Sequence, residues 1–308
     1  MSDALDRLLR LLADRGYRFV TPTPATHARI VARPAMVEAH SIRDVLGWSL
    51  PFPPRLLDDE LHACLAEAGA LNPVDTSLLR ATIRVSSLDD LLFIHSAYPT
   101  DLPDAVFFGP DSYRFASLIA AELDHAPLRA GARIVDIGAG AGVGAIVAAR
   151  CCDTPAVTMV DINPTALDLA RINARFAGVD ADFVLGETLD AIAGPIDLAV
   201  ANPPYLIDES KRAYRDGGGM HGTEIALTMA EHAVARLSSD GRLILYTGSA
   251  IIDGGDPLRS ALERVAARAG RRLRYRELDP DVFGEELDAP AYADVERIAL
   301  VAAIIEPA

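Results

Sequence analysis

The spacing of apolar residues changes once along the chain, near residue 100. In residues 1 to about 75, apolar positions recur at helical spacing, as at Leu61, Leu65 and Ala68, between frequent prolines. This pattern predicts short helices. Two β-rich runs, Ile83–Val85 and Leu91–Ile94, then flank a polar turn, which predicts a hairpin. We therefore predict a smaller, mostly helical N-terminal domain with a β-hairpin over residues 1–100, and a second domain over residues 101–308.

From Arg133 onward, short apolar strands alternate with helices of about 12 residues. This alternation predicts an α/β domain with a largely parallel sheet covered on both faces. One helix has signals at both ends: Asn163 can cap it, Pro164 occupies its first position and Gly178 closes it.

Charge and cysteine content narrow the class of protein. The 308 residues include 29 Lys and Arg against 44 Asp and Glu, a net charge of −15, which disfavours nucleic acid as a partner. Three cysteines cannot form a disulfide framework, and neither they nor the seven histidines have the spacing of metal ligands. No uncharged apolar run is long enough to span a membrane. We expect a cytoplasmic protein with no metal and no membrane association.

A candidate ligand site follows the first strand of the second domain. Asp136 ends this strand, and Gly138, Gly140, Gly142 and Gly144 follow in the turn. Glycine allows a tight turn and a close approach of the backbone to a ligand, and the next helix presents free N–H groups there. Because Asp136 and the glycine turn lie at the carboxyl end of the sheet, we expect a ligand in the crevice beside them.

Two carboxylates favour one type of ligand over another. Asp161 ends the next strand, where an acidic residue can accept both hydroxyls of a ribose. Counted from Gly138, the dinucleotide pattern G-x-G-x-x-G fails at Val143, although a shifted frame satisfies its looser form. A carboxylate at Asp136 would repel a pyrophosphate but would suit an amino group. These features favour S-adenosylmethionine, and a nicotinamide cofactor remains an alternative.

A second candidate site is the sequence Asn202-Pro203-Pro204-Tyr205, which follows the strand Ile196–Ala201. The two prolines lack N–H donors and have a fixed φ, so they end the strand and hold the chain rigid. The side-chain oxygen of Asn202 and the carbonyl of Pro203 become two fixed acceptors, and Tyr205 supplies a flat aromatic face. This set can hold a planar NH₂ group by its two hydrogens.

With these motifs the sequence resembles class I S-adenosylmethionine-dependent methyltransferases over about residues 105 to 305, and specifically the HemK-type branch that methylates the side-chain amide of protein glutamine. The resemblance rests on D-I-G-A-G-A-G, V-D-I-N-P and N-P-P-Y in that order. It implies a Rossmann-like domain with a mainly parallel seven-stranded sheet and an antiparallel last hairpin, and an N-terminal domain that recognises the substrate.

The resemblance also implies site roles. The methionine part of S-adenosylmethionine would lie on Asp136, Gly138 and Gly140, its ribose on Asp161, and its adenine between Ile162 and Glu187. The catalytic set that would hold the target nitrogen, with Asn202 also beside the cofactor, is Asn202, Pro203, Pro204 and Tyr205.

Two departures leave the acceptor open. The family usually has a longer, all-helical N-terminal domain and a Glu-Pro pair before a Gly-Gly segment, whereas this chain has Tyr214-Arg215-Asp216 before Gly217-Gly218-Gly219. A protein glutamine is the leading acceptor, and a nucleic-acid base or a small metabolite is the alternative. A cofactor-binding protein without catalysis is a further reading. His221 and the loop 214–222 are candidates for acceptor contacts, and Phe107–Ser112 for a flap over the cofactor.

Overall fold

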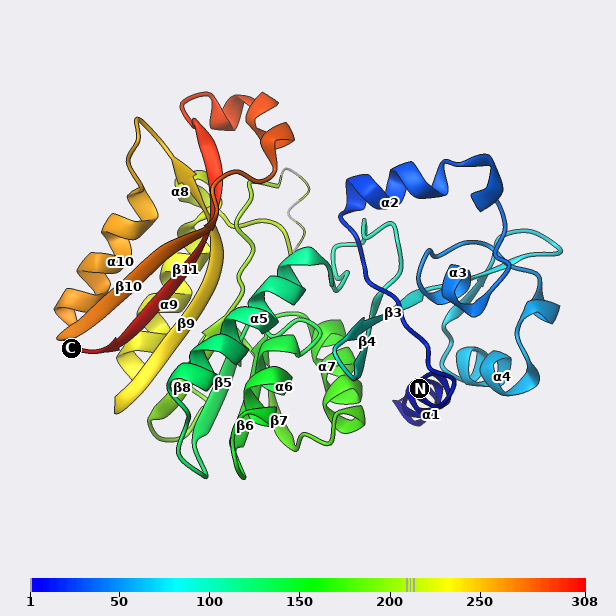
Figure 1. Ribbon diagram of the computed structural model, residues 1–308, viewed down its shortest axis with the longest axis horizontal. Helices are drawn as coiled ribbons and strands as arrows, with labels where there is room; N and C mark the ends of the chain where they lie inside the picture. Colours follow the sequence, from blue (N-terminus) through cyan, green and yellow to red (C-terminus); the bar gives the residue numbers. More distant parts are fainter. Residues whose placement is uncertain (1, 209, 211, 213) are drawn as a thin grey trace.

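The computed structural model describes residues 2–208, 210, 212 and 214–308. Figure 1 shows a smaller part built from the start of the chain beside a larger part built around one sheet. The smaller part contains helices α1 (Ser2–Asp14), α2 (Pro24–Val31), α3 (Ile42–Leu46) and α4 (Asp59–Glu67), the 3₁₀ turns η1 (Pro34–Met36) and η2 (Pro54–Leu56), and strands β1 (Leu71–Pro73), β2 (Leu79–Ala81), β3 (Ile83–Leu88) and β4 (Leu91–Ser96). None of the described helices is both long and apolar enough to cross a bilayer.

The predicted hairpin is present as the antiparallel pair β3 and β4, and α1 buries its apolar side, including Leu5, Leu8, Leu9 and Leu12. The sequence did not indicate β1 and β2, which pair with each other. Strands of three residues are too short to show an alternation of apolar and polar positions. Helix α1 and strand β4 contact α7 (Pro164–Phe176) of the larger part, so the boundary near residue 100 stays a prediction.

The larger part consists of helices α5 to α10 and strands β5 to β11. In chain order these are α5 (Pro110–His125), β5 (Arg133–Ile137), α6 (Val143–Arg150), β6 (Ala156–Asp161), α7 (Pro164–Phe176), β7 (Ala181–Leu185), β8 (Ile196–Ala201), α8 (Gly219–Gly222), α9 (Glu224–Arg236), β9 (Leu237–Ile251), α10 (Pro257–Arg268), β10 (Arg271–Asp279), η3 (Gly284–Asp288), η4 (Pro290–Tyr292) and β11 (Arg297–Pro307). The predicted caps of α7 are confirmed: the Asn163 side chain accepts from Thr165 N at 3.0 Å, and Gly178 has a positive φ.

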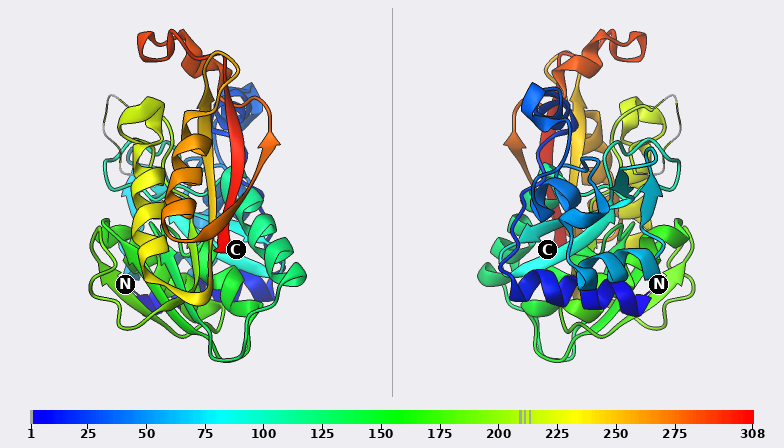
Figure 2. Two further views of the ribbon diagram at one scale, coloured as in Figure 1. Left: turned by 90° about the vertical axis from the view of Figure 1, so that its left-hand side faces the viewer. Right: turned by 90° about the vertical axis from the view of Figure 1, so that its right-hand side faces the viewer.

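The sheet has seven strands in the order β10-β11-β9-β8-β5-β6-β7. The strands β5 to β9 run parallel, and β11 pairs antiparallel with both β9 and β10. The expected sheet, mainly parallel with an antiparallel last hairpin, is confirmed. Figure 2 shows helices on both faces, with α9 and α10 on one side and α5 on the other.

The order of the strands positions the site. From β5 the chain moves outward to β6 and β7 on one side and then returns to β8 on the other side of β5. In open α/β sheets, ligands bind beyond the carboxyl ends of the strands at such a reversal. The glycines follow β5, Asp161 ends β6 and Asn202 follows β8, so the topology brings all three to this point.

Candidate functional site

A cavity of about 1100 Å³ lies at the carboxyl ends of β5, β6 and β8. It is larger than the roughly 300–1000 Å³ of a typical small-molecule site, so it has room for two ligands that meet inside it. The structure brings the whole of the expected cofactor-binding and catalytic sets into its lining: Asp136, Gly138, Gly140, Asp161, Ile162, Glu187, Asn202, Pro203, Pro204 and Tyr205.

The glycine turn forms one wall of the cavity. Gly138, Gly140 and Gly142 have φ of 69°, 55° and 82°, in the left-handed region that favours glycine. No atom lies within 4 Å of where a Cβ on Gly140 would be, so the backbone there borders open space. A ligand can therefore approach this turn closely.

Asp136 of β5 is buried beside the first turn of α6. Its carboxylate accepts a hydrogen bond from Ala145 N at 2.7 Å, and its exposed fraction is 1%. Burial raises the pKa of this carboxyl to about 7, because the charged form is poorly solvated there. A Cβ on Gly144 would lie 2.8 Å from the Asp136 carboxylate, which explains a glycine within the helix. An amino group placed beside Asp136 would favour its ionised form.

Asp161 links the turns that follow β5 and β6. One carboxylate oxygen accepts from Gly140 N and the other from Asn163 N, both at 2.8 Å. Each oxygen keeps acceptor capacity for a further hydrogen bond, as two neighbouring hydroxyls would supply. Beside it, the apolar Ile162 side chain is 53% exposed at the cavity, and Glu187 lines the same end after β7.

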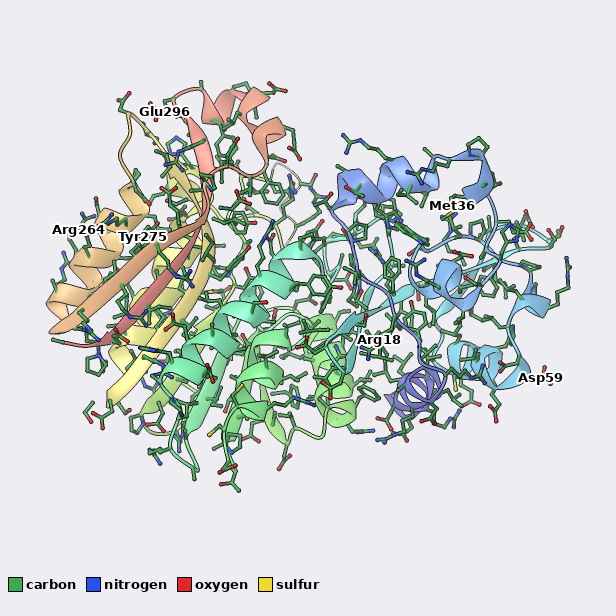
Figure 3. The ribbon with its side chains drawn as sticks, viewed as in Figure 1. Arg18, Met36, Asp59, Arg264, Tyr275 and Glu296 are labelled. Atoms are coloured by element: carbon green, nitrogen blue, oxygen red, sulfur yellow. The ribbon has the colours of Figure 1, made fainter. Side chains whose placement is uncertain are left out.

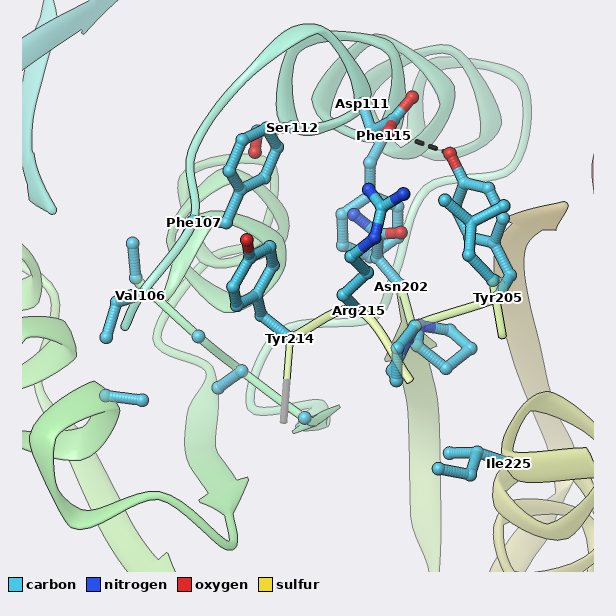
Figure 4. Close-up of a pocket in the computed structure, with 18 of the residues that line it drawn as sticks. Val106, Phe107, Asp111, Ser112, Phe115, Asn202, Tyr205, Tyr214, Arg215 and Ile225 are labelled. Atoms are coloured by element: carbon cyan, nitrogen blue, oxygen red, sulfur yellow. Dashed lines mark hydrogen bonds between the residues drawn. The ribbon is translucent and has the colours of Figure 1, made fainter. Parts of the chain in front are cut away.

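The tetrad Asn202–Tyr205 forms the middle of the cavity. Among the residues that the structure describes, no side-chain hydrogen bond partner is found for the half-buried Asn202 amide. Tyr205 is almost fully buried, and its hydroxyl donates to Asp111 Oδ2 at 2.8 Å, as Figure 4 shows. The tetrad therefore offers a free amide beside an aromatic ring that is held in place.

Beyond the tetrad, both parts of the chain form the cavity walls. Phe107 stacks on Tyr214, with ring centroids 5.5 Å apart and planes 12° from parallel (Figure 4). Arg215 forms an ion pair with Glu286, and Arg29 of α2 also lines this end. The two phenylalanines of the predicted flap differ in position: Phe107 lines the cavity, whereas Phe108 lies in the core.

His221 lies outside this cavity lining. Its Nε2 is 3.0 Å from Asp294 Oδ1, and it has a φ of 53° in the short α8 segment. His232 of α9 lines the cavity instead, as do Tyr214 and Arg215 of the loop 214–222. No sequence signal singles out His232, whose neighbours in the chain form an ordinary helix.

No group of three or more His, Cys, Asp or Glu within the described residues is arranged to hold a metal ion. The charged groups at the glycine end are the carboxylates of Asp136, Asp161 and Glu187, while the arginines of the lining, Arg29, Arg114 and Arg215, come from other segments. This distribution suits a cationic or hydroxyl-bearing ligand and disfavours a pyrophosphate at the turn.

Comparison with known proteins places this arrangement in a family. Residues 114–266 match the model of the methyltransferase small domain. A glutamine methyltransferase of release factors from Deinococcus radiodurans is 35% identical over 160 residues, covering 50% of this chain and 55% of that protein. The chain contains a class I methyltransferase domain. The resemblance expected from the sequence is thereby confirmed.

Further relatives agree with this assignment. A release factor glutamine methyltransferase from Chlamydia trachomatis is 32% identical over 162 residues, covering 49% of this chain and 54% of that one. The crystal structure of a SAM-dependent methyltransferase from Agrobacterium tumefaciens shares the fold of the methyltransferase domain, with a TM-score of 0.50, 15% identity, and coverage of 77% of this chain and 76% of that one. The chain spans about half the length of the curated relatives that it matches.

Proposed function

We propose that this chain transfers a methyl group from S-adenosylmethionine to the side-chain amide nitrogen of a glutamine in a protein. One observation carries the proposal: a single cavity joins the glycine turn and its carboxylates to the Asn202–Tyr205 tetrad, where the Asn202 amide has no partner among the described residues. A donor at one end and a planar nitrogen at the other would meet in this cavity.

The glycine end fits S-adenosylmethionine. Asp136 would take the ammonium of the methionine part beside Gly138 and Gly140, since a cation there would stabilise the ionised carboxylate that burial disfavours. Asp161 would accept from the ribose hydroxyls with the lone pairs left free by its two backbone hydrogen bonds. The exposed Ile162 side chain would pack on adenine, and Glu187 would accept from its amino group.

When bound, S-adenosylmethionine supplies an electrophilic methyl group on a positively charged sulfur. The task of the protein is to orient a weak nucleophile, because the lone pair of an amide nitrogen is delocalised. The Asn202 side-chain oxygen and the Pro203 carbonyl would accept the two N–H hydrogens, favour a pyramidal nitrogen and direct its lone pair toward the methyl group. Alignment of this kind supplies about 7–11 kcal/mol in well-oriented systems.

No general base is required in this scheme. The nitrogen becomes acidic as its bond to the methyl carbon forms and the carbon–sulfur bond breaks, so one of its protons is lost to water after the transfer. Pro203 and Pro204 fix the backbone that carries both acceptors, which limits the reorganisation needed at the moment of reaction.

A protein is the proposed acceptor for three reasons. The two curated relatives described above are release factor glutamine methyltransferases, and the net charge of −15 disfavours nucleic acid. The cavity also continues past the tetrad to Arg29 of α2 and Glu286 of the segment between β10 and β11, which leaves room for a peptide segment. A cytoplasmic location, without a membrane partner, is part of the same proposal.

The test is a labelling experiment with S-adenosylmethionine that carries a labelled methyl group. The purified chain is incubated with the donor and a cell extract, and the product is treated separately with nuclease and protease. We expect label that protease releases and nuclease does not, and methylglutamine after complete digestion. Label released by nuclease would assign a nucleic-acid base as acceptor, label in small molecules would assign a metabolite, and no label in any fraction would contradict the proposal.

A further inference from the structure

Asp111 receives hydrogen bonds from two tyrosine hydroxyls at the edge of the cavity. Tyr205 donates to its Oδ2 and Tyr246 donates to its Oδ1, each at 2.8 Å. Asp111 lies in the first turn of α5, 94 residues before Tyr205. The carboxylate thus joins α5, the tetrad and β9.

We propose that Asp111 is a positioning residue that fixes the ring of Tyr205 against the acceptor amide. This inference rests on the proposed function, in which Tyr205 is one wall of the acceptor site. The prolines set the backbone of the tetrad, but they do not set the side-chain torsions of Tyr205. A hydrogen bond at the far end of the ring does so.

Packing holds the ring of Tyr205 on two of its sides. A Cβ on Gly248 of β9 would lie only 2.2 Å from the Tyr205 ring, so the ring lies directly on the backbone of that strand. On another side, Phe283 meets the ring in a T-shaped contact with centroids 5.8 Å apart. The hydrogen bond to Asp111 holds the far end of the ring, which neither of these contacts fixes.

The charges around Asp111 suit this role. Arg114, one turn along α5, has a guanidinium nitrogen 3.4 Å from Asp111 Oδ1, so a cation lies beside the carboxylate that the two hydroxyls share. Burial, and then the Asp111 charge, raises the pKa of both Tyr205 and Tyr246, so the two hydroxyls remain protonated donors. Hydrogen bonds to an ionised acceptor are stronger than those between neutral groups.

A double-mutant cycle tests the proposal with the labelling assay. We expect Tyr205→Phe and Asp111→Ala each to lower kcat by about 10- to 100-fold, as for a small misplacement of reacting groups, while the dissociation constant of S-adenosylmethionine changes less than about twofold. The double variant should be no slower than the slower single variant, because both changes remove one interaction. Effects that multiply, or a Tyr205→Phe enzyme with the kcat of the unmodified chain, would overturn the assignment.

Two further variants separate positioning from general stability. Asp111→Asn keeps the shape of the side chain and an acceptor oxygen, so it should recover part of the kcat lost in Asp111→Ala. Tyr275→Phe is the matched control. Tyr275 lies on β10 (Figure 3), its hydroxyl donates to Asp256, the N-cap residue of α10, at 2.6 Å, and it is not part of the cavity lining. This control should keep full kcat, and an equal loss there would assign the effect of Asp111→Ala to folding.

A spectroscopic measurement distinguishes failure of this inference from failure of the proposed function. In protein isotopically labelled at the tyrosine rings, Tyr205→Phe and Tyr246→Phe assign the NMR signals of the two rings. These signals should shift in Asp111→Ala without any acceptor present. If the unmodified chain labels no protein and these signals shift, the proposed function fails and the contact stands. If the signals of Tyr205 are unchanged in Asp111→Ala, this inference fails whatever the acceptor.

Discussion

Asn173 of α7 pairs with Ile94 of β4 through both backbone groups of that residue. Its Oδ1 accepts from Ile94 N at 2.8 Å, and its Nδ2 donates to Ile94 O at 3.0 Å and to Ala141 O at 2.9 Å. The side chain is buried, with 1% of its surface exposed. A single amide therefore joins the N-terminal hairpin to the glycine turn, since Ala141 lies between Gly140 and Gly142.

Replacing Asn173 by leucine should destabilise the whole chain. The change preserves volume but leaves three buried backbone groups without partners, and each such group costs roughly 1–3 kcal/mol. We expect a lower midpoint of urea unfolding and a smaller free energy of unfolding. Asn72→Ala, at an exposed position in β1, is the control and should change neither. An unchanged midpoint in Asn173→Leu would show that this amide does not hold the two parts together.

Local sequence signals predicted most of the larger part, because its strands and helices have regular periods and clear caps such as Asn163. The residues that border the proposed donor were predictable for the same reason. Each lies at the end of a strand or in the turn that follows it, and the spacing of apolar residues and glycines indicates where those strands and turns are. Asp111 and Asn173 carried no such signal. Their partners lie 94 and 79 residues away in the chain, and only the folded structure brings them together.

Asn202→Ala should reduce turnover far more than cofactor affinity. The variant loses one of the two acceptors proposed to orient the target nitrogen, whereas the glycine turn and the carboxylates remain. We expect kcat to fall by about 100-fold, with calorimetric binding of S-adenosylmethionine within a few-fold of the unmodified chain. Loss of cofactor binding with intact turnover per bound complex would contradict this role.

Affinity for S-adenosylmethionine should rise with pH through the region near 7. The buried Asp136 carboxyl has a pKa of about 7 and has to be ionised to pair with an ammonium group. Below this pH, binding first releases a proton, so the dissociation constant should fall about tenfold for each pH unit gained and level off above the pKa. Calorimetry in two buffers of different ionisation enthalpy measures the released proton. Asp136→Asn should show weaker binding and a flat profile, and a pH dependence that survives this substitution would assign the titration to another group.

Acid should weaken the N-terminal part before most carboxylates titrate, because two histidines are buried beside the cationic Arg84. Burial and the Arg84 charge lower the pKa of His27 to about 4 and that of His95 well below its ordinary value. No hydrogen bond partner is found among the described residues for His27 Nε2 or His95 Nδ1. Both side chains are therefore neutral in the folded state.

The sign of the pH effect follows from these shifts. An unfolded histidine takes up a proton near pH 6.5, whereas the folded one does so only at lower pH. The contribution of the two neutral histidines to the free energy of unfolding should therefore be complete above pH 6.5. It should fall as the pH drops toward 4, by up to about 1.4 kcal/mol per pH unit for each histidine.

The fluorescence of the single tryptophan, Trp48, can follow unfolding in this region, because the ring centroids of Trp48 and His27 are 5.2 Å apart. His27→Leu should reduce the slope of stability against pH, and the exposed His40→Gln should leave it unchanged. The same slope in all three proteins would mean that His27 does not control acid stability.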